Sequence, residues 1–395
     1  MNKPLLLTIV LLAFAGAAGP SMASASVPGA AIHTSPAEAA RLSDPVVVAA
    51  AKDPALPAPE ATLSTPTLPP ASASAKGSDV EVNDTTSFPN RIQGKIIVEF
   101  NDSVDQTYAC SGTMVDSVEQ NVVFTAGHCV YDNDTNAFPS AMVFIPGYNN
   151  GIEPFGEIPV NFAHTTNGWH DREDFDYDMG AVQLEGTPEA TLGARGIAFD
   201  LSTKNRKFKI YGYPAEPAPY YDGERLIRCD ASFKGRDGKE ALAPMAGGPC
   251  FMQQGASGGG WITGGRYLNS LTSYIYCDSD PKSCGLDFGP YFSNQARSLY
   301  KTVATSQVPT VKFVKAPPKV VRHKSVKFRL GGSGTTPIRN FTCKLDANPY
   351  RACFPLTRIT RLTNGRHTLK VYSLDQTGHR SDTFVTASFR VKAPR

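Results

Sequence analysis

Residues 119–133 read EQNVVFTAGHCVYDN, and the interpretation of the whole chain depends on this stretch. A β-branched and aromatic run stops at Thr-Ala-Gly, and His128 then stands directly beside Cys129. The histidine could be a metal ligand, a structural side chain or a catalytic base. A zinc site requires further ligands at short spacing, whereas His164 and His170 follow about forty residues later without a ligand pattern. The sequence therefore predicts neither a metal site nor a cofactor.

A catalytic histidine predicts further residues downstream. A histidine that activates a serine needs a carboxylate to orient it and backbone donors for the oxyanion. The segment FDYDMGAVQL places Asp178 at the head of an apolar strand, and QQGASGGGW places Ser257 in a glycine-rich turn. Asp176 is the rival of Asp178, but the apolar strand begins directly after Asp178. His128, Asp178 and Ser257 are therefore the candidate catalytic residues.

The segments CSGTMV, VVFTAGHC, YDMGAV and GASGGGW resemble the chymotrypsin/trypsin family of serine proteases. The similarity is closest to the secreted bacterial branch and the glutamyl endopeptidases, and it covers about residues 85–305. It implies two antiparallel six-stranded β-barrels with the active site between them. It further implies His128 as the general base, Asp178 as its orienting partner and Ser257 as the nucleophile. The amide groups of Gly255 and Ser257 would form the oxyanion hole.

Departures from the family pattern bear on specificity. Phe251 stands six residues before Ser257, where trypsins carry the carboxylate at the floor of the substrate pocket. Ser273 is expected on the pocket wall, and Thr272 stands where glutamate-specific relatives place a histidine. A broad or apolar preference is the resulting hypothesis.

The composition of the first residues is typical of an exported protein. Residues 1–25 have a lysine, an apolar run and then small residues, which predicts a secretory signal peptide. Residues 26–84 are rich in Ala, Pro and Ser and poor in aromatic residues, so we expect a propeptide or linker that cannot order itself. No later segment is long and apolar enough to span a bilayer. We therefore expect a secreted, extracellular protein without a transmembrane anchor.

Export also determines how the eight cysteines are interpreted. None lies in the leader, and an even number in an oxidising compartment predicts disulfides. The resemblance implies a bridge from Cys129 back to Cys110, while sequence alone leaves 105 ways to pair eight cysteines. Pairing close neighbours gives Cys110–Cys129, Cys229–Cys250, Cys277–Cys284 and Cys343–Cys353.

The C-terminal 87 residues form a separate basic unit. Residues 309–395 hold 18 Lys and Arg against 3 Asp and Glu, a net charge of +15, so the remainder of this +3 chain carries −12. Strand alternation, the Asn364–Gly365 turn and the two cysteines resemble the Ig-like or fibronectin-type β-sandwich modules of secreted bacterial proteins. We expect a hairpin at this turn.

The charge of this unit suggests a partner as well as a fold. Its positive field favours anionic cell-wall or surface polymers, although a charged, solubilising stalk fits equally well. No specific nucleic-acid motif is present.

The sequence favours the first of three functions and leaves the other two as alternatives. The first is a secreted serine endopeptidase, expected as a monomer, that acts on proteins or peptides. The second is a catalytically inactive binding or adhesion protein that acts through its basic module. The third is an esterase that uses the same three side chains.

Overall fold

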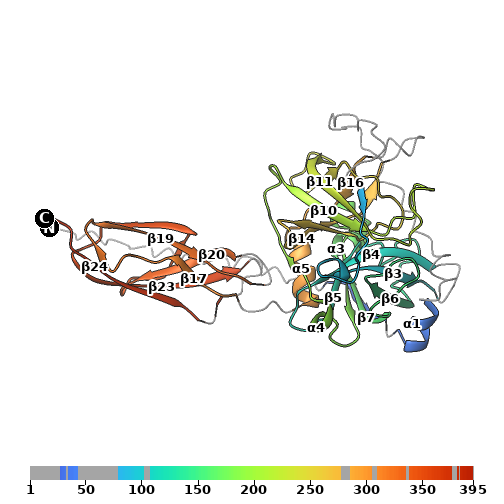
Figure 1. The fold of residues 1–395 in the computed structure, drawn as a ribbon, viewed down its shortest axis with the longest axis horizontal. Helices are drawn as coiled ribbons and strands as arrows, with labels where there is room; N and C mark the ends of the chain where they lie inside the picture. The colour runs from blue at the N-terminus through green and yellow to red at the C-terminus, as the bar shows by residue number, and fades with distance from the viewer. Residues whose placement is uncertain are drawn as a thin grey trace, which may run out of the picture.

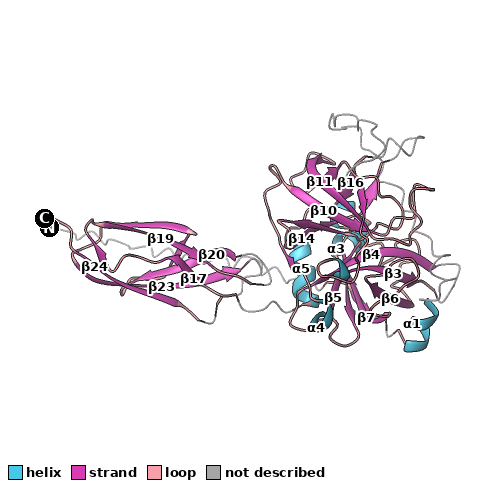
Figure 2. Ribbon diagram, viewed as in Figure 1, coloured by secondary structure: helices cyan, strands magenta, loops and turns pink. Residues whose placement is uncertain are grey.

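The computed structural model describes residues 27–32, 34–42, 79–101, 107–276, 285–304, 309–334, 338–375, 380–381 and 383–394. Strands dominate these residues, and the helices are few and short (Figures 1 and 2). A double-sheet region at the right of Figure 1 is followed along the chain by an elongated second unit at the left. The all-β fold class is confirmed. None of the helices in these residues has the length and apolar character needed to cross a membrane.

The first sheet closes into a six-stranded antiparallel barrel. Strand β8 pairs with both β5 and β7, and this double pairing completes the ring β7-β6-β3-β4-β5-β8. Strands β3, β5 and β6 are buried along their whole length, as expected for runs rich in Val, Ile and Phe. The bounds are β3 (Gln93–Glu99), β4 (Thr107–Val115), β5 (Val122–Thr125), β6 (Ala141–Pro146), β7 (Ile158–Thr165) and β8 (Gly180–Leu184).

The second sheet has the strand order β15-β16-β12-β11-β10-β13-β14-β9. Its pairings form an open path among the described residues, so here the structure differs from the second closed barrel that we expected. The β-rich, chymotrypsin-like architecture is nevertheless confirmed. The bounds are β9 (Gly196–Ile197), β10 (Lys207–Gly212), β11 (Ile227–Arg236), β12 (Met245–Gly248), β13 (Gly260–Thr263), β14 (Tyr267–Leu271), β15 (Tyr274–Ile275) and β16 (Asp287–Gly289).

Parts of the Ala/Pro/Ser-rich segment are ordered on the first barrel. Strand β1 (Gly29–Ala31) pairs with β7, and helix α1 (Pro36–Leu42) follows it. Ser35 and Glu38 cap this helix reciprocally, which satisfies two otherwise unpaired N–H groups. The Arg41 guanidinium reaches both carboxylate oxygens of Glu99 on the barrel, at 2.8 and 2.9 Å. The segment is ordered through contacts with the barrel rather than through a core of its own.

A further strand from the same segment lies on the second sheet. Strand β2 (Asp79–Glu81) pairs antiparallel with β11, so that Asp79 lies opposite Cys229. The N-terminal segment therefore touches both halves of the double-sheet region.

A buried ion pair joins the two halves. Lys95 of β3 has a side chain only 2% exposed, and its Nζ lies 3.0 Å from an oxygen of Glu224, which precedes β11. The other Glu224 oxygen accepts a 2.5 Å hydrogen bond from the Tyr148 hydroxyl. Tyr213 in turn donates to the carbonyl oxygen of Tyr148 at 2.9 Å. Polar side chains thus tie the first barrel to the second sheet across their interface.

Short helices complete this region. Helix α5 is amphipathic and buries Leu299, Tyr300 and Val303 in the core of the first barrel. The helical elements are η1 (Asn90–Ile92), α3 (Asn167–Arg172), η3 (Phe175–Tyr177), α4 (Glu189–Leu192) and α5 (Asn294–Val303).

The C-terminal unit consists of two sheets around its own core. A three-stranded sheet, β17-β19-β22, and a five-stranded sheet, β18-β24-β23-β20-β21, share buried residues that include Phe328, Phe341 and Phe389. The likeness to Ig-like modules stays a prediction. The bounds are β17 (Lys312–Lys315), β18 (Val320–Val321), β19 (Ser325–Gly331), β20 (Ile338–Leu345), β21 (Arg351–Cys353), β22 (Leu356–Thr360), β23 (Gly365–Asp375) and β24 (Val385–Val391).

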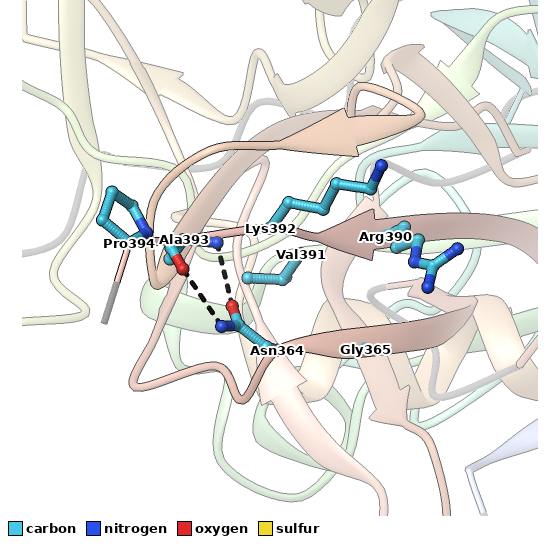
Figure 3. Close-up of a pocket in the computed structure, with 7 residues that line it drawn as sticks. All are labelled: Asn364, Gly365, Arg390, Val391, Lys392, Ala393 and Pro394. Carbon is cyan, nitrogen blue, oxygen red and sulfur yellow. Dashed lines mark hydrogen bonds between the residues drawn. The ribbon is translucent and has the colours of Figure 1, made fainter.

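The Asn364–Gly365 pair does not form the expected hairpin turn. It connects β22 of one sheet to β23 of the other, and these two strands do not pair. The Asn364 carboxamide instead donates to the Ala393 carbonyl at 3.0 Å and accepts from its N–H at 2.8 Å (Figure 3). The turn signal in the sequence was correct, but the turn leads the chain from sheet to sheet and fastens the end of β24.

Three of the four expected disulfides are present, namely Cys110–Cys129, Cys229–Cys250 and Cys343–Cys353. The fourth, Cys277–Cys284, lies outside the described residues. The last of the three joins the neighbouring strands β20 and β21.

Candidate active site

His128 follows β5 in a turn that only a small residue at position 127 permits. A Cβ atom on Gly127 would lie 2.7 Å from the Trp169 ring and 2.8 Å from an oxygen of Asp178. Thr125 fixes the start of the turn by donating to the Ser111 carbonyl at 2.9 Å. The Thr-Ala-Gly-His order thus lets the His128 side chain, 3% exposed, lie against a carboxylate.

Asp178 lies at the C-cap of η3, two residues before β8, and is fully buried. One carboxylate oxygen lies 2.9 Å from His128 Nδ1, and the other accepts from the His128 backbone N–H at 2.9 Å. Burial by itself would raise the pKa of Asp178, but the charge and hydrogen bonds of His128, with a further bond from Ser273, outweigh it. The pKa of Asp178 therefore lies below its ordinary value, and the group is an anion at neutral pH.

The rival carboxyl group has a different environment. Asp176 lies within η3, where its N–H donates to Asp174. Burial, and then the negative charges of Asp174 and Asp237, raise the pKa of Asp176 to about 6. The structure therefore places Asp178, rather than Asp176, against His128 Nδ1.

Ser273 has a contact that the sequence did not predict. It was expected on the wall of the substrate pocket, yet its hydroxyl donates to Asp178 Oδ2 at 2.5 Å. Its own N–H donates to the Phe288 carbonyl of β16 at 2.9 Å, which fixes the serine beside the carboxylate. No pattern in the sequence signals this bond, because Ser273 and Asp178 lie 95 positions apart.

The loop that carries Ser257 is fastened to the first barrel. The Ser257 carbonyl accepts from the Ser111 N–H at 2.7 Å and lies 3.9 Å from the Cys129 sulfur. Ser257 thus lies beside the disulfide residue that follows His128. Gly255 and Gly258 have φ values of +88° and +80°, a left-handed region that favours glycine.

Ser111 is a site residue that the sequence did not reveal. Its hydroxyl accepts from the Tyr213 N–H at 2.9 Å and donates to the Gly255 carbonyl at 2.8 Å. A Cβ on Gly255 would lie 2.4 Å from the Tyr213 carbonyl, so only glycine fits here. Ser111 therefore fixes the orientation of the peptide group between Gly255 and Ala256, just ahead of Ser257.

Phe251, the other residue expected at the substrate pocket, is half-buried. Its N–H donates at 3.0 Å to Asp79, which also accepts a 2.5 Å hydrogen bond from the Tyr221 hydroxyl. The structure thus brings a carboxylate from the N-terminal segment to the position where the sequence suggested an apolar pocket.

The donor groups near the site do not fit a metal centre. Two groups of three possible ligands occur among the described residues, Cys110 with His128 and Cys129, and Asp79 with Cys229 and Cys250. In each group both cysteines are joined in a disulfide, so their sulfurs are not thiolates. A single histidine or carboxylate remains in each.

Comparisons with known proteins give two curated relatives. A protein named extracellular metalloprotease from Bacillus subtilis is 27% identical over 196 residues, 49% of this chain and 61% of that protein. The glutamyl endopeptidase of Bacillus licheniformis is 27% identical over 182 residues, 45% of this chain and 54% of that protein. The chain therefore spans little more than half the length of the curated relatives it matches. No family model matches it.

Solved structures similar to this chain include two proteases. The protease Anisep from Arthrobacter nicotinovorans is 26% identical, with a TM-score of 0.48 over 58% of this chain and 98% of that chain. The thermostable serine protease AL20, from an extremophilic microorganism, is 30% identical, with a TM-score of 0.47 over 54% of this chain and 98% of that chain. By its strands and by its sequence likeness to the glutamyl endopeptidase, the chain is a relative of the trypsin-like serine proteases.

Proposed function

We propose that the protein is a secreted serine endopeptidase that hydrolyses peptide bonds through His128, Asp178 and Ser257. The observation that carries the proposal is the environment of Asp178. This carboxylate is fully buried, yet three hydrogen bonds and the charge of His128 hold its pKa down. A buried anion against Nδ1 of a histidine fixes the tautomer in which Nε2 can accept a proton.

The proposed reaction has two half-reactions. Ser257 Oγ attacks the substrate carbonyl carbon while His128 Nε2 takes the hydroxyl proton, and Asp178 stabilises the imidazolium. The N–H groups of Gly255 and Ser257 would bind the resulting oxyanion. His128 then gives the proton to the leaving amine, and the C–N bond breaks to leave an acyl-Ser257 ester. Water, activated by His128, hydrolyses this ester and restores the serine.

The experiment that tests this proposal uses the protein purified from a culture medium. A fluorophosphonate reagent is expected to label Ser257 stoichiometrically, and casein degradation is expected to stop after labelling. Ser257→Ala should lose both labelling and proteolysis, whereas Ser202→Ala, at an exposed loop position, should retain both.

Different outcomes separate the alternatives. Loss of activity on chelation with an unlabelled Ser257 would support a metal-dependent peptidase and overturn the serine mechanism. Ester hydrolysis without peptide hydrolysis would favour an esterase. Folded protein with neither labelling nor hydrolysis would favour the inactive binding protein.

The division of the chain is also part of the proposal. Residues 1–25 act as the signal peptide, residues 26–84 as a propeptide or linker, and residues 85–305 as the protease domain. Residues 309–395, with their net charge of +15, bind anionic cell-wall or surface polymers. Retention of the full chain on purified cell walls should fall steeply between 50 and 500 mM salt, on the order of tenfold or more. Retention that does not change with salt would contradict an electrostatic contact.

A further inference from the structure

The five-stranded sheet of the C-terminal unit has an inner and an outer face. Leu369, Val371 and Phe389 belong to the buried core of this unit, and they define the inner face. Side chains alternate along a strand, so the residues between them lie on the outer face. Charged, hydroxyl-bearing and aromatic side chains of β20, β23 and β24 lie there in register, namely Lys344, Thr368, Lys370, Tyr372, Thr386 and Ser388. All of them are half-buried or exposed, so the outer face of the sheet is open to solvent.

Three aromatic rings lie in contact on this outer face. Tyr372 is half-buried and lies between Tyr350 and Phe384, which are 42% and 44% exposed. The Tyr372 ring centroid is 5.6 Å from that of Tyr350 and 5.5 Å from that of Phe384. These three residues form an aromatic row. Large apolar side chains gathered on a surface are typical of an interaction site, and a stalk that only solubilises the protein does not need them.

A cation lies over each ring of the aromatic row. The distances to the ring centroids are 5.4 Å for Lys344 over Tyr350, 4.5 Å for Arg380 over Tyr372 and 4.7 Å for Lys370 over Phe384. Asp346, the carboxylate among the described side chains of this unit, pairs instead with His367. The three cations therefore have no carboxylate partner among these side chains. The row repeats one ring and one positive charge three times.

This repeat indicates the chemistry of a matching ligand. A polymer with one ring and one negative charge per unit can place each ring on an aromatic side chain and each charge beside a cation. A polysaccharide of uronic-acid sugars has this composition, because the C–H face of each sugar is apolar and each sugar carries one carboxylate. The hydroxyl groups of Thr368, Thr386 and Ser388 on the same face offer hydrogen-bond donors and acceptors to sugar hydroxyl groups.

We propose that the outer face of the five-stranded sheet, centred on the aromatic row, binds an acidic polysaccharide of uronic-acid sugars. The inference rests on the proposed attraction of residues 309–395 to anionic polymers, and it specifies the surface and the class of polymer. The net charge of +15 attracts any polyanion. The aromatic row selects, among polyanions, those that contain sugar rings. Binding of this kind would hold the double-sheet region close to the polymer.

Single-stranded nucleic acid is the rival ligand, because it also carries one ring and one negative charge per unit. Its bases bind by stacking face to face on aromatic side chains. A base inserted between two rings needs them about 7 Å apart, twice the usual contact distance of about 3.5 Å. The rings of the aromatic row are 5.6 and 5.5 Å apart, and their planes are inclined by 58° and 64°. This arrangement leaves no room for a base between them and favours sugars, which do not need parallel ring planes.

The test measures binding of the full chain to polygalacturonate by titration calorimetry at about 150 mM salt. Tyr372→Ala is expected to raise Kd roughly tenfold. Tyr350→Ala, at a position outside the strands, should raise Kd by a similar factor without disturbing the sheet. The matched controls lie on the three-stranded sheet, namely Leu356→Ala, at a side chain that is 70% exposed, and Lys327→Gln, at an exposed cation. Both controls should leave Kd within about twofold.

Two comparison polymers separate sugar contacts from electrostatic attraction. Poly-L-glutamate carries carboxylates without sugar rings, so Tyr372→Ala should leave its Kd within about twofold. Lys370→Gln should raise Kd roughly threefold for both polygalacturonate and poly-L-glutamate, because both lose a counter-charge. Fully methyl-esterified polygalacturonate keeps the sugars without the charge and should bind at least about 30-fold more weakly than polygalacturonate. An unchanged Tm shows that each variant is folded.

Three results would overturn the polysaccharide proposal. The first is equal binding of poly-L-glutamate and polygalacturonate, with no effect of Tyr372→Ala on either, which would leave the proposed electrostatic attraction in place without a sugar site. The second is tighter binding of an oligothymidylate that Tyr372→Ala abolishes, which would assign the aromatic row to single-stranded nucleic acid. The third is binding to none of these polymers, which would contradict the proposed attraction itself.

Discussion

The double-sheet region and the C-terminal unit handle charge in opposite ways. The double-sheet region buries ionisable side chains, since Lys95, Glu99, Asp178 and Asp287 are all 3% exposed or less. Among the described residues of the C-terminal unit, His367 is the buried ionisable side chain, and the many Lys and Arg lie on the surface. A buried charge has its pKa set by its neighbours, whereas an exposed charge acts mainly through the summed field. Chemistry is therefore expected in the first region and electrostatic attraction in the second.

The strongest test of this contrast removes the charge of Asp178. Asp178→Asn should lower kcat/KM by about 10⁴-fold, because the amide no longer holds the productive tautomer of His128. Loss of peptidase activity on casein or on a p-nitroanilide measures the effect. Lys327→Ala, an exposed cation of the C-terminal unit, should leave kcat/KM unchanged. If kcat/KM of a folded Asp178→Asn protein decreased by less than about tenfold, the assigned role would be contradicted.

The next test compares ion pairs in the two regions. Glu224→Gln leaves the buried Lys95 ammonium without its counter-charge and should lower the free energy of unfolding by about 3 kcal/mol. In the C-terminal unit, Asp346→Asn breaks the pair with His367. Because the Asp346 side chain is 38% exposed, this change should lower the free energy of unfolding by less than about 1 kcal/mol. Urea unfolding of both variants gives the two values. Equal losses in the free energy of unfolding would show that burial does not make the Lys95–Glu224 pair more important for stability than the Asp346–His367 pair.

A smaller effect is expected at Ser273. Ser273→Ala removes one hydrogen bond to the Asp178 carboxylate, which should lower kcat by roughly tenfold and leave KM nearly unchanged. Ser273→Thr keeps a hydroxyl and should restore much of the loss. A rise in KM with constant kcat would instead assign Ser273 to substrate binding, as the sequence suggested.

The smallest effect concerns stability against pH. Burial, and then the negative charge of Asp79, raise the pKa of Asp287 in the folded protein. Its contribution to stability is therefore complete below its unfolded pKa of about 3.9 and is lost as pH rises through the folded value. Asp287→Asn does not titrate, so its Tm should exceed that of the wild type by at least about 2 °C more at pH 8 than at pH 4. Calorimetry at the two pH values measures this difference. If the difference in Tm between variant and wild type were the same at pH 4 and pH 8, the raised pKa of Asp287 would be contradicted.

The sequence was informative where function depends on local chain geometry. The Thr-Ala-Gly-His-Cys run and the glycine-rich turn around Ser257 are local signals, because small residues at set positions let two backbones approach each other. The resemblance to known proteases predicted the overall fold and the disulfide between Cys110 and Cys129.

What the sequence could not predict depends on distant pairings. Ser273, just before β15 of the second sheet, meets Asp178, just before β8 of the first, across 95 positions, and Asp79 meets Phe251 across 172 positions. The Asn364–Gly365 turn was interpreted from local chemistry, which cannot tell a hairpin from a crossing between two sheets. The order of β1 and α1 likewise comes from the barrel surface and not from their composition.

The pairing of β2 with β11 ties the N-terminal segment to the loop that carries Ser257, because it holds Asp79 against the Phe251 N–H. Any proteolytic cut between β2 and β3 that released the upstream peptide would carry Asp79 away. The Tyr221 hydroxyl and the Phe251 N–H would then lose their acceptor. Such a cut would therefore alter the surroundings of that loop as well as uncover one edge of β11.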